Sequence, residues 1–247
     1  MRQTALYHDE NGEELTSANP LPIYSITPFT MLDFPKHVAC IIWFSGCNMR
    51  CAYCHNPQIV KGKTHIKPSK ILSFLQQRQG LLDGVVLSGG ESTLYKDLPY
   101  FAQTIRDMDY KIKLDTNGTN PVVLKELLDK NLLDYVALDY KAPAQKFAAL
   151  TKMKRVTSFE TSLSMLTRQT SVPLEIRTTV HTDLLNEDDI GMMIETLDRL
   201  NYTGTYFIQN FRNDNRPTLG DLPAQVKPLN IDKLPTPQNF QIKYRNF

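Results

Sequence analysis

The sequence lacks both a long hydrophobic run and a strong excess of one charge. Its 247 residues contain 28 Lys plus Arg and 26 Asp plus Glu, a formal net charge of +2. Such a balance does not favour a nucleic-acid or membrane-surface binder. Apolar runs such as residues 38–44 are far shorter than the roughly 18 residues that span a bilayer, and residues 1–15 lack the apolar core of a secretory signal. We therefore expect a cytoplasmic protein that binds neither nucleic acid nor membrane.

Cysteine is also scarce, and its positions argue against a disulfide framework. The four cysteines are Cys40, Cys47, Cys51 and Cys54, and none follows them. Disulfides would be spread along a small secreted chain, whereas a tight group of thiols indicates metal ligation. Structural zinc usually takes two separated pairs of ligands, and the sequence has no second pair. Cys40 lies in an apolar, β-branched segment that predicts a buried strand, so we expect it to pack in the core.

Three thiolates remain without a fourth protein ligand. A four-iron cluster ordinarily takes four cysteines. With three, one iron keeps an open position that can bind a substrate or cofactor directly, as the open position of a catalytic zinc does. The alternative is a zinc loop in which Cys40 supplies the fourth ligand.

The spacing Cys47-x3-Cys51-x2-Cys54, in a loop after an early strand, resembles the radical S-adenosylmethionine (SAM) superfamily. In that superfamily the open iron chelates the amino and carboxylate groups of SAM. Tyr53 matches an aromatic residue that the superfamily places beside the adenine. The resemblance thus implies that the three cysteines hold a [4Fe-4S] cluster and that Tyr53 contacts SAM.

A second segment extends the resemblance. Residues 82–91 predict a strand that runs into Gly89, Gly90 and Glu91, and two glycines allow a close backbone approach to a ligand. This pattern resembles the Gly-Gly-Glu motif that holds the SAM amino group, although Ser92 stands where the family often has proline. By the same resemblance Asp115, Thr116, Asn117, Asp139 and Lys141 surround SAM. Arg177 is a candidate for the SAM carboxylate, because a guanidinium fork matches a carboxylate. The matching Asp, Thr and Asp bind a monovalent cation in some relatives, which adds such a cation to the candidate cofactors.

Strands and helices alternate after residue 34. The patterns predict strands over 38–44, 84–88, 111–115, 135–139, 174–180 and 205–210, and helices over 69–79, 98–108, 121–130, 158–169 and 186–200. Six such units predict a parallel α/β sheet, and the resemblance implies an incomplete (β/α)6 barrel. We expect three parts: an N-terminal extension (1–34) with a short strand near 23–26, the partial barrel (35–216), and a C-terminal tail or strap (217–247). The predicted site residues lie at the carboxyl ends of strands, where parallel barrels build active sites.

Local sequence narrows the resemblance to the glycyl-radical-enzyme activases. Cys51-Ala-Tyr-Cys-His-Asn-Pro57, with residues 89–91, 115–118 and 138–141, is similar to activating proteins of anaerobic ribonucleoside-triphosphate reductase, over about residues 23–212. This implies reductive cleavage of SAM to a 5′-deoxyadenosyl radical, which takes hydrogen from a glycine of the partner, anaerobic ribonucleotide reductase. Flavodoxin or ferredoxin would donate the electron. No acid or base catalyst is then required, since the cofactor supplies the chemistry. The alternatives are a radical SAM enzyme with a small-molecule substrate, such as a deazapurine precursor, and a non-catalytic zinc-binding module.

Overall fold

A single sheet organises the computed structural model, which describes residues 21–63, 66–212 and 217–247. In these residues eight strands pair in chain order from β1 to β8. Their bounds are β1 (Ile23–Thr30), β2 (Ala39–Phe44), β3 (Gly84–Gly89), β4 (Lys111–Thr116), β5 (Tyr135–Asp139), β6 (Leu174–Val180), β7 (Thr205–Asn210) and β8 (Gln241–Arg245). β1 runs antiparallel to β2, and every later neighbour is parallel. Within the described residues β1 and β8 do not pair, so the sheet does not close. The expected parallel α/β fold is confirmed.

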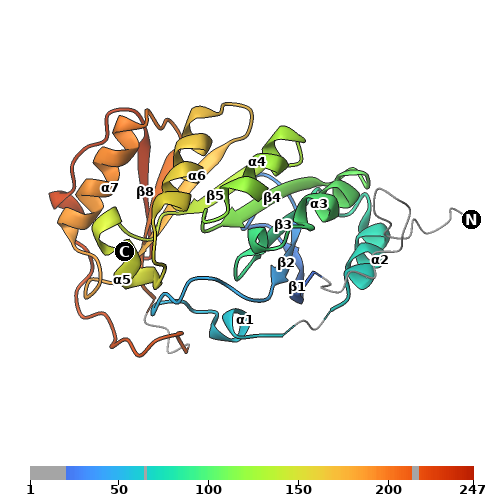
Figure 1. Ribbon diagram of the computed structural model, residues 1–247, viewed down its shortest axis with the longest axis horizontal. Coiled ribbons are helices and arrows are strands. Elements are labelled where there is room, and N and C mark those ends of the chain that lie inside the picture. Colours follow the sequence, from blue (N-terminus) through green and yellow to red (C-terminus); the bar gives the residue numbers. More distant parts are fainter. Residues whose placement is uncertain (1–20, 64–65, 213–216) are drawn as a thin grey trace, which may run out of the picture.

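α-Helices connect the parallel strands from β2 to β7, and in the described residues only the turn η2 (Ile231–Lys233) lies between β7 and β8. The helices are α1 (Pro57–Val60), α2 (Pro68–Arg78), α3 (Leu98–Arg106), α4 (Pro121–Asp129), α5 (Ala144–Thr151), α6 (Thr157–Arg168) and α7 (Glu187–Arg199), with short 3-10 turns η1 (Ser92–Leu94) and η2. Several start signals are local: α2, α3 and α4 carry proline in their first turn, and Asn186 and Asp189 form a capping box at α7. Figure 1 shows α3, α4 and α6 side by side along one side of the sheet.

The two faces of the sheet differ in character. The outer face and the helices share one large apolar core, which includes Cys40. On the inner face, Ile41, Val86, Lys113 and Tyr135 lie in register across β2 to β5. A smaller apolar group, Phe34, Ala39, Ile41 and Val86, fills the amino-terminal end of this face. Charged residues follow toward the carboxyl ends of the strands. The inner face is therefore apolar and packed at the amino-terminal end of the sheet and polar at its carboxyl-terminal end, which we call the mouth of the sheet.

The structure extends the chain ends beyond the sequence prediction. The strand expected near residues 23–26 reaches Thr30. The segment after residue 217 was expected to be a poorly structured tail or a strap, and it ends in β8, which hydrogen-bonds in parallel to β7. The expected extension also covers residues 1–20, which lie outside the described residues. In the part of the chain that the structure describes, no helix is long and apolar enough to cross a membrane.

Candidate cofactor site

The cysteine loop (residues 45–56) leaves the carboxyl end of β2 and is fixed by backbone hydrogen bonds. Ser45 N–H donates to Pro22 O at 2.6 Å, and Gly46 N–H donates to Ile59 O at 2.9 Å. Further along, Arg50 N–H donates to Thr151 O at 2.8 Å, and the Arg50 guanidinium reaches the carbonyl oxygens of Cys47 and Met49. The loop is therefore anchored at its start and its middle before any ligand binds.

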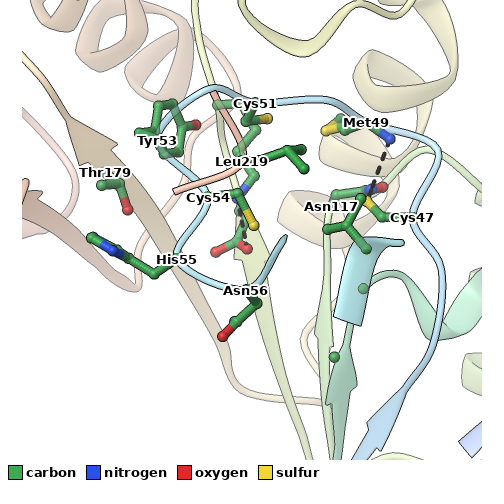
Figure 2. Close-up of a pocket in the computed structure, with 15 residues that line it drawn as sticks. Cys47, Met49, Cys51, Tyr53, Cys54, His55, Asn56, Asn117, Thr179 and Leu219 are labelled. Atoms are coloured by element: carbon green, nitrogen blue, oxygen red, sulfur yellow. Dashed lines mark hydrogen bonds and ion pairs between the residues drawn. The ribbon is translucent and has the colours of Figure 1, made fainter. Parts of the chain in front are cut away.

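Cys47, Cys51 and Cys54 all line one cavity of about 230 Å³ at the polar mouth of the sheet. Figure 2 shows Cys47 beside Asn117 on one side of this cavity, with Cys51 and Cys54 on the other. Cys40 does not line it. That thiol is fully buried in the core, and burial raises its pKa to about 12. The prediction that Cys40 packs in the core is confirmed.

The donor set fits an iron–sulfur cluster, because the three thiols that line the cavity can each bind one iron and leave the fourth iron open. In the described residues no group of three or more His, Cys, Asp or Glu side chains is placed to hold a single metal ion. Thiolates of a cubane cluster bind separate irons and stand further apart. Burial raises the pKa of the Cys47 thiol to about 11, an effect that the backbone N–H of Met49 partly offsets. A cationic cluster would favour the thiolate form that burial disfavours.

The double glycine lets the end of β3 press against the start of the cysteine loop. Gly89 has φ +126°, a conformation that side chains rarely adopt. A Cβ atom on Gly90 would lie 1.8 Å from the carbonyl oxygen of Gly46. That carbonyl accepts a hydrogen bond from Glu91 N–H at 2.9 Å. The backbone conformation of Gly89 and the close packing of Gly90 against Gly46 therefore require glycine at these positions whether or not a ligand binds. Both glycines also line the cavity.

Glu91 does not line the cavity, and its carboxylate is fully hydrogen-bonded within the protein. Oε1 accepts from Thr93 N–H at 3.1 Å, Thr93 Oγ1 at 2.6 Å and Thr116 Oγ1 at 2.8 Å. Oε2 accepts from Asn117 N–H at 2.6 Å. Burial raises the pKa of Glu91, and these donors oppose the rise. Glu91 thus ties the end of β3 to the end of β4, behind the cavity wall.

A charged layer lies on the inner face, partly in the wall of the cavity and partly below it. Arg177 Nε donates to Asp139 Oδ1 at 3.0 Å, and its Nη1 lies 3.6 Å from Asp115 Oδ2 and 3.7 Å from Glu175 Oε1. Lys141 pairs with Asp139 at 3.0 Å, and Lys113 pairs with Asp115. The six groups carry three charges of each sign. Such a buried network is stable only while its charges stay paired.

The network perturbs the acidities of its members. Burial would raise the pKa of Asp139, but Arg177 and Lys141 outweigh it and lower the pKa to about 2. The pKa of Asp115 is lowered too, since Arg177 and Lys113 overcome the effect of burial. Every carboxylate oxygen of Asp115 and Asp139 has a protein partner. A monovalent cation at these two residues would therefore share these carboxylate oxygens with the protein donors.

The structure brings most of the predicted site residues to the cavity. Of those beyond the cysteines, six line it: Tyr53, Gly89, Gly90, Asn117, Asp139 and Lys141. Glu91, Asp115, Thr116 and Arg177 do not line it. Glu91 and Arg177 contact the lining residues Asn117 and Asp139, whereas Asp115 pairs with Arg177 and Thr116 donates to Glu91. The Lys141 ammonium lies 6.0 Å from the centre of the Tyr53 ring, within cation–π range.

Sequence reasoning missed two members of the charged layer and six residues that line the cavity, which are Met49, His55, Asn56, Val60, Thr179 and Leu219. Lys113 and Glu175 stand two residues before Asp115 and Arg177, so a period-two reading of the strands could have placed them on the same inner face. Leu219 comes from the strap (residues 217–240), where Leu219 N–H donates to Cys54 O and Gly220 N–H donates to Ala52 O, each at 2.9 Å. No local signal predicts these contacts, because 165 residues separate Cys54 from Leu219.

Comparisons with known proteins agree with this geometry. A family profile described as the radical SAM superfamily matches residues 41–200. A relative from Methanocaldococcus jannaschii, provisionally named a glycyl-radical enzyme activating enzyme, is 29% identical over 90% of this chain and 88% of its own length. A probable GTP 3′,8-cyclase from Pyrococcus abyssi is 32% identical over 46% of this chain and 36% of its own length.

Solved structures share the fold at low sequence identity. SuiB from Streptococcus suis, in a crystal structure with bound S-adenosylmethionine, is 12% identical with a TM-score of 0.57, over 83% of this chain and 52% of that chain. The family uses a [4Fe-4S] cluster together with SAM. The profile match covers more than half of the sequence, and it spans all three cavity cysteines and the double glycine. The chain therefore belongs to the radical SAM superfamily.

Proposed function

We propose that this chain is an activating enzyme for a glycyl radical enzyme. The observation that carries the proposal is the single cavity at the mouth of the sheet, where three thiols, the double glycine and Lys141 meet. The likeness to a provisionally named activating enzyme over 90% of the chain supports the choice of activity. When bound, the cluster and SAM together supply a 5′-deoxyadenosyl radical that takes a hydrogen atom from the substrate.

The residues of the chain have separate tasks in this proposal. Cys47, Cys51 and Cys54 hold the cluster and leave one iron open. Lys141, held by Asp139, presents a positive charge at the cavity wall and suits the carboxylate of SAM. Burial opposes this charge, yet Asp139 keeps the pKa of Lys141 raised, so the side chain stays cationic.

The remaining residues either contact SAM through the cavity wall or support that wall from behind. Gly89 and Gly90 present backbone to the amino group of SAM, and the ring of Tyr53 packs toward the adenine. Glu91 contributes by holding the turn after β3, since its oxygens are occupied by Thr93, Thr116 and Asn117. Asp115 and Arg177 support the wall from the charged layer, and Thr116 supports it through its hydrogen bond to Glu91. No acid or base residue is required, because a hydrogen atom moves rather than a proton.

The partner we propose is anaerobic ribonucleotide reductase, with a glycine as hydrogen donor and flavodoxin or ferredoxin as electron donor. A small-molecule substrate is the alternative. The match to a probable GTP cyclase supports this alternative, but that match covers less than half of the chain. The two differ in where the abstracted hydrogen originates.

Deuterium transfer distinguishes the two proposals. The reconstituted protein is mixed anaerobically with SAM, a reductant and a candidate reductase that carries α-deuterated glycine. We expect deuterium in the 5′-deoxyadenosine and a glycyl radical signal in electron paramagnetic resonance (EPR). A parallel reaction contains a deuterated purine nucleotide in place of the reductase. Cleavage of SAM with deuterium transfer from this nucleotide, and with none from any glycine, would refute the activase proposal.

A further inference from the structure

The side-chain amide of Asn117 has a defined orientation. Asn117 directly follows β4 and is 4% exposed. Its Oδ1 accepts hydrogen bonds from Thr119 N–H at 3.0 Å and from Thr119 Oγ1 at 2.6 Å. A backbone N–H can only donate, so the amide oxygen must face Thr119. The Nδ2 group is thereby turned the other way, toward the cysteine loop.

Two acceptors on the cysteine loop meet this Nδ2 group. It lies 2.9 Å from Asn48 Oδ1 and 3.8 Å from the sulfur of Cys47. Asn48 in turn donates through Nδ2 to Thr119 Oγ1 at 2.7 Å, which closes a ring of hydrogen bonds through Asn117, Thr119 and Asn48. Figure 2 shows Asn117 next to Cys47. It also shows the 3.4 Å hydrogen bond that Met49 N–H donates to the sulfur of Cys47.

Asn117 also connects this sulfur to the turn after β3. Its backbone N–H donates to Glu91 Oε2 at 2.6 Å. The residue is therefore a junction between the cysteine loop and the Gly-Gly-Glu turn, and its side chain faces a thiol. The resemblance of the sequence implied a contact with SAM, whereas the hydrogen bonds direct the amide to Cys47.

We propose that Asn117 is a positioning residue for the cluster, which donates a hydrogen bond to the Cys47 thiolate and raises the reduction potential of the cluster. The inference rests on the proposed function, in which Cys47 binds iron. Reduction adds negative charge to the cluster and its sulfurs, so a donor to a sulfur stabilises the reduced form more than the oxidised form. The fixed ring through Thr119 and Asn48 keeps the donor in place without reorganisation.

The test compares two isosteric changes on one loop. Asn117→Asp keeps the oxygen that faces Thr119 and replaces the donor to Cys47 by an oxygen. Asn120→Asp is the matched control, because Asn120 lies three residues further on, donates to Thr93 O and has no bond to a thiol. Iron and sulfide content are measured first, and the midpoint potential of the cluster is then titrated by EPR.

We expect both variants to bind the cluster. For Asn117→Asp the reduction equilibrium should become at least tenfold less favourable, which for one electron is a shift of about 59 mV to more negative potential. Asn120→Asp should shift the midpoint potential by less than half of that amount. Equal potentials for Asn117→Asp and the control would overturn the inference.

A second measurement needs no substitution. The unsubstituted protein is labelled with ¹⁵N in the asparagine side chains, and the reduced cluster is examined by pulsed EPR. A ¹⁵N coupling is expected, and its absence would overturn the inference even if Asn117→Asp failed to assemble a cluster. A protein that binds no [4Fe-4S] cluster at all would instead refute the proposed function, and this inference with it.

Discussion

Replacing Glu91 tests whether the carboxylate of the Gly-Gly-Glu turn stabilises the fold or binds the ligand. In Glu91→Ala two buried backbone N–H groups, those of Thr93 and Asn117, lose their acceptor. Each unsatisfied group costs about 1–3 kcal/mol, so the free energy of unfolding should fall by roughly 2–6 kcal/mol. In Glu91→Gln the new amide N–H₂ faces Asn117 N–H, and loss of that one bond predicts a fall of about 1–3 kcal/mol.

The assay is urea unfolding of the cluster-free protein under reducing, anaerobic conditions, followed by circular dichroism. Glu126→Gln serves as control, because the Glu126 side chain is 43% exposed and pairs at 2.9 Å with Lys130, the residue that caps the end of α4. Its effect should stay below about 0.5 kcal/mol. If Glu91→Gln matched this control in stability and yet weakened SAM binding, Glu91 would be a direct ligand and its structural role would be refuted.

Three further predictions follow from the site. Cys47→Ala should abolish assembly of the cluster while Cys40→Ala retains it, as judged by iron content and absorbance; loss in Cys40→Ala would make that buried thiol a ligand. The pKa of Asp139 is lowered to about 2 from an ordinary 3.8, so it should stabilise the fold by roughly 2 kcal/mol above pH 4, and lose this as the pH falls toward 2. Asp139→Asn should flatten the dependence of the free energy of unfolding on pH between pH 5 and 2, and an unchanged pH dependence would contradict the paired state. Gly220→Val should speed loss of the cluster in air several-fold, because a Cβ on Gly220 would lie 2.6 Å from that of Ala52; Gly191→Ala, with only ordinary contacts, is the control that should not.

Most of the parallel strands could be predicted because each is a short apolar run between turn signals. The strands over 135–139, 174–180 and 205–210 were predicted with the bounds that the structure gives them. β8 was not predicted, since Gln241–Arg245 is polar and mostly exposed. It becomes a strand only by pairing with the edge of β7. α5 (Ala144–Thr151) was also missed, although Pro143 precedes it and Lys152 ends it in a left-handed conformation.

The site shows the same division between local and long-range information. The spacing of Cys47, Cys51 and Cys54 and the double glycine are local, and the structure brings them to one cavity. Glu91 accepts hydrogen bonds from Thr116 and Asn117 only because of the register of β3 against β4. The contact of Leu219 with the cysteine loop depends on the path of the strap. Neither can be derived from one segment of sequence alone.

Cleavage of SAM is the measurement that tests the central claim most directly. The protein is reconstituted anaerobically with iron and sulfide, and dithionite and SAM are added. We predict a four-iron spectrum and formation of 5′-deoxyadenosine, both lost in Cys51→Ala. A protein that binds zinc tightly, assembles no cluster and releases no 5′-deoxyadenosine would contradict the claim and make the chain a metal-binding module.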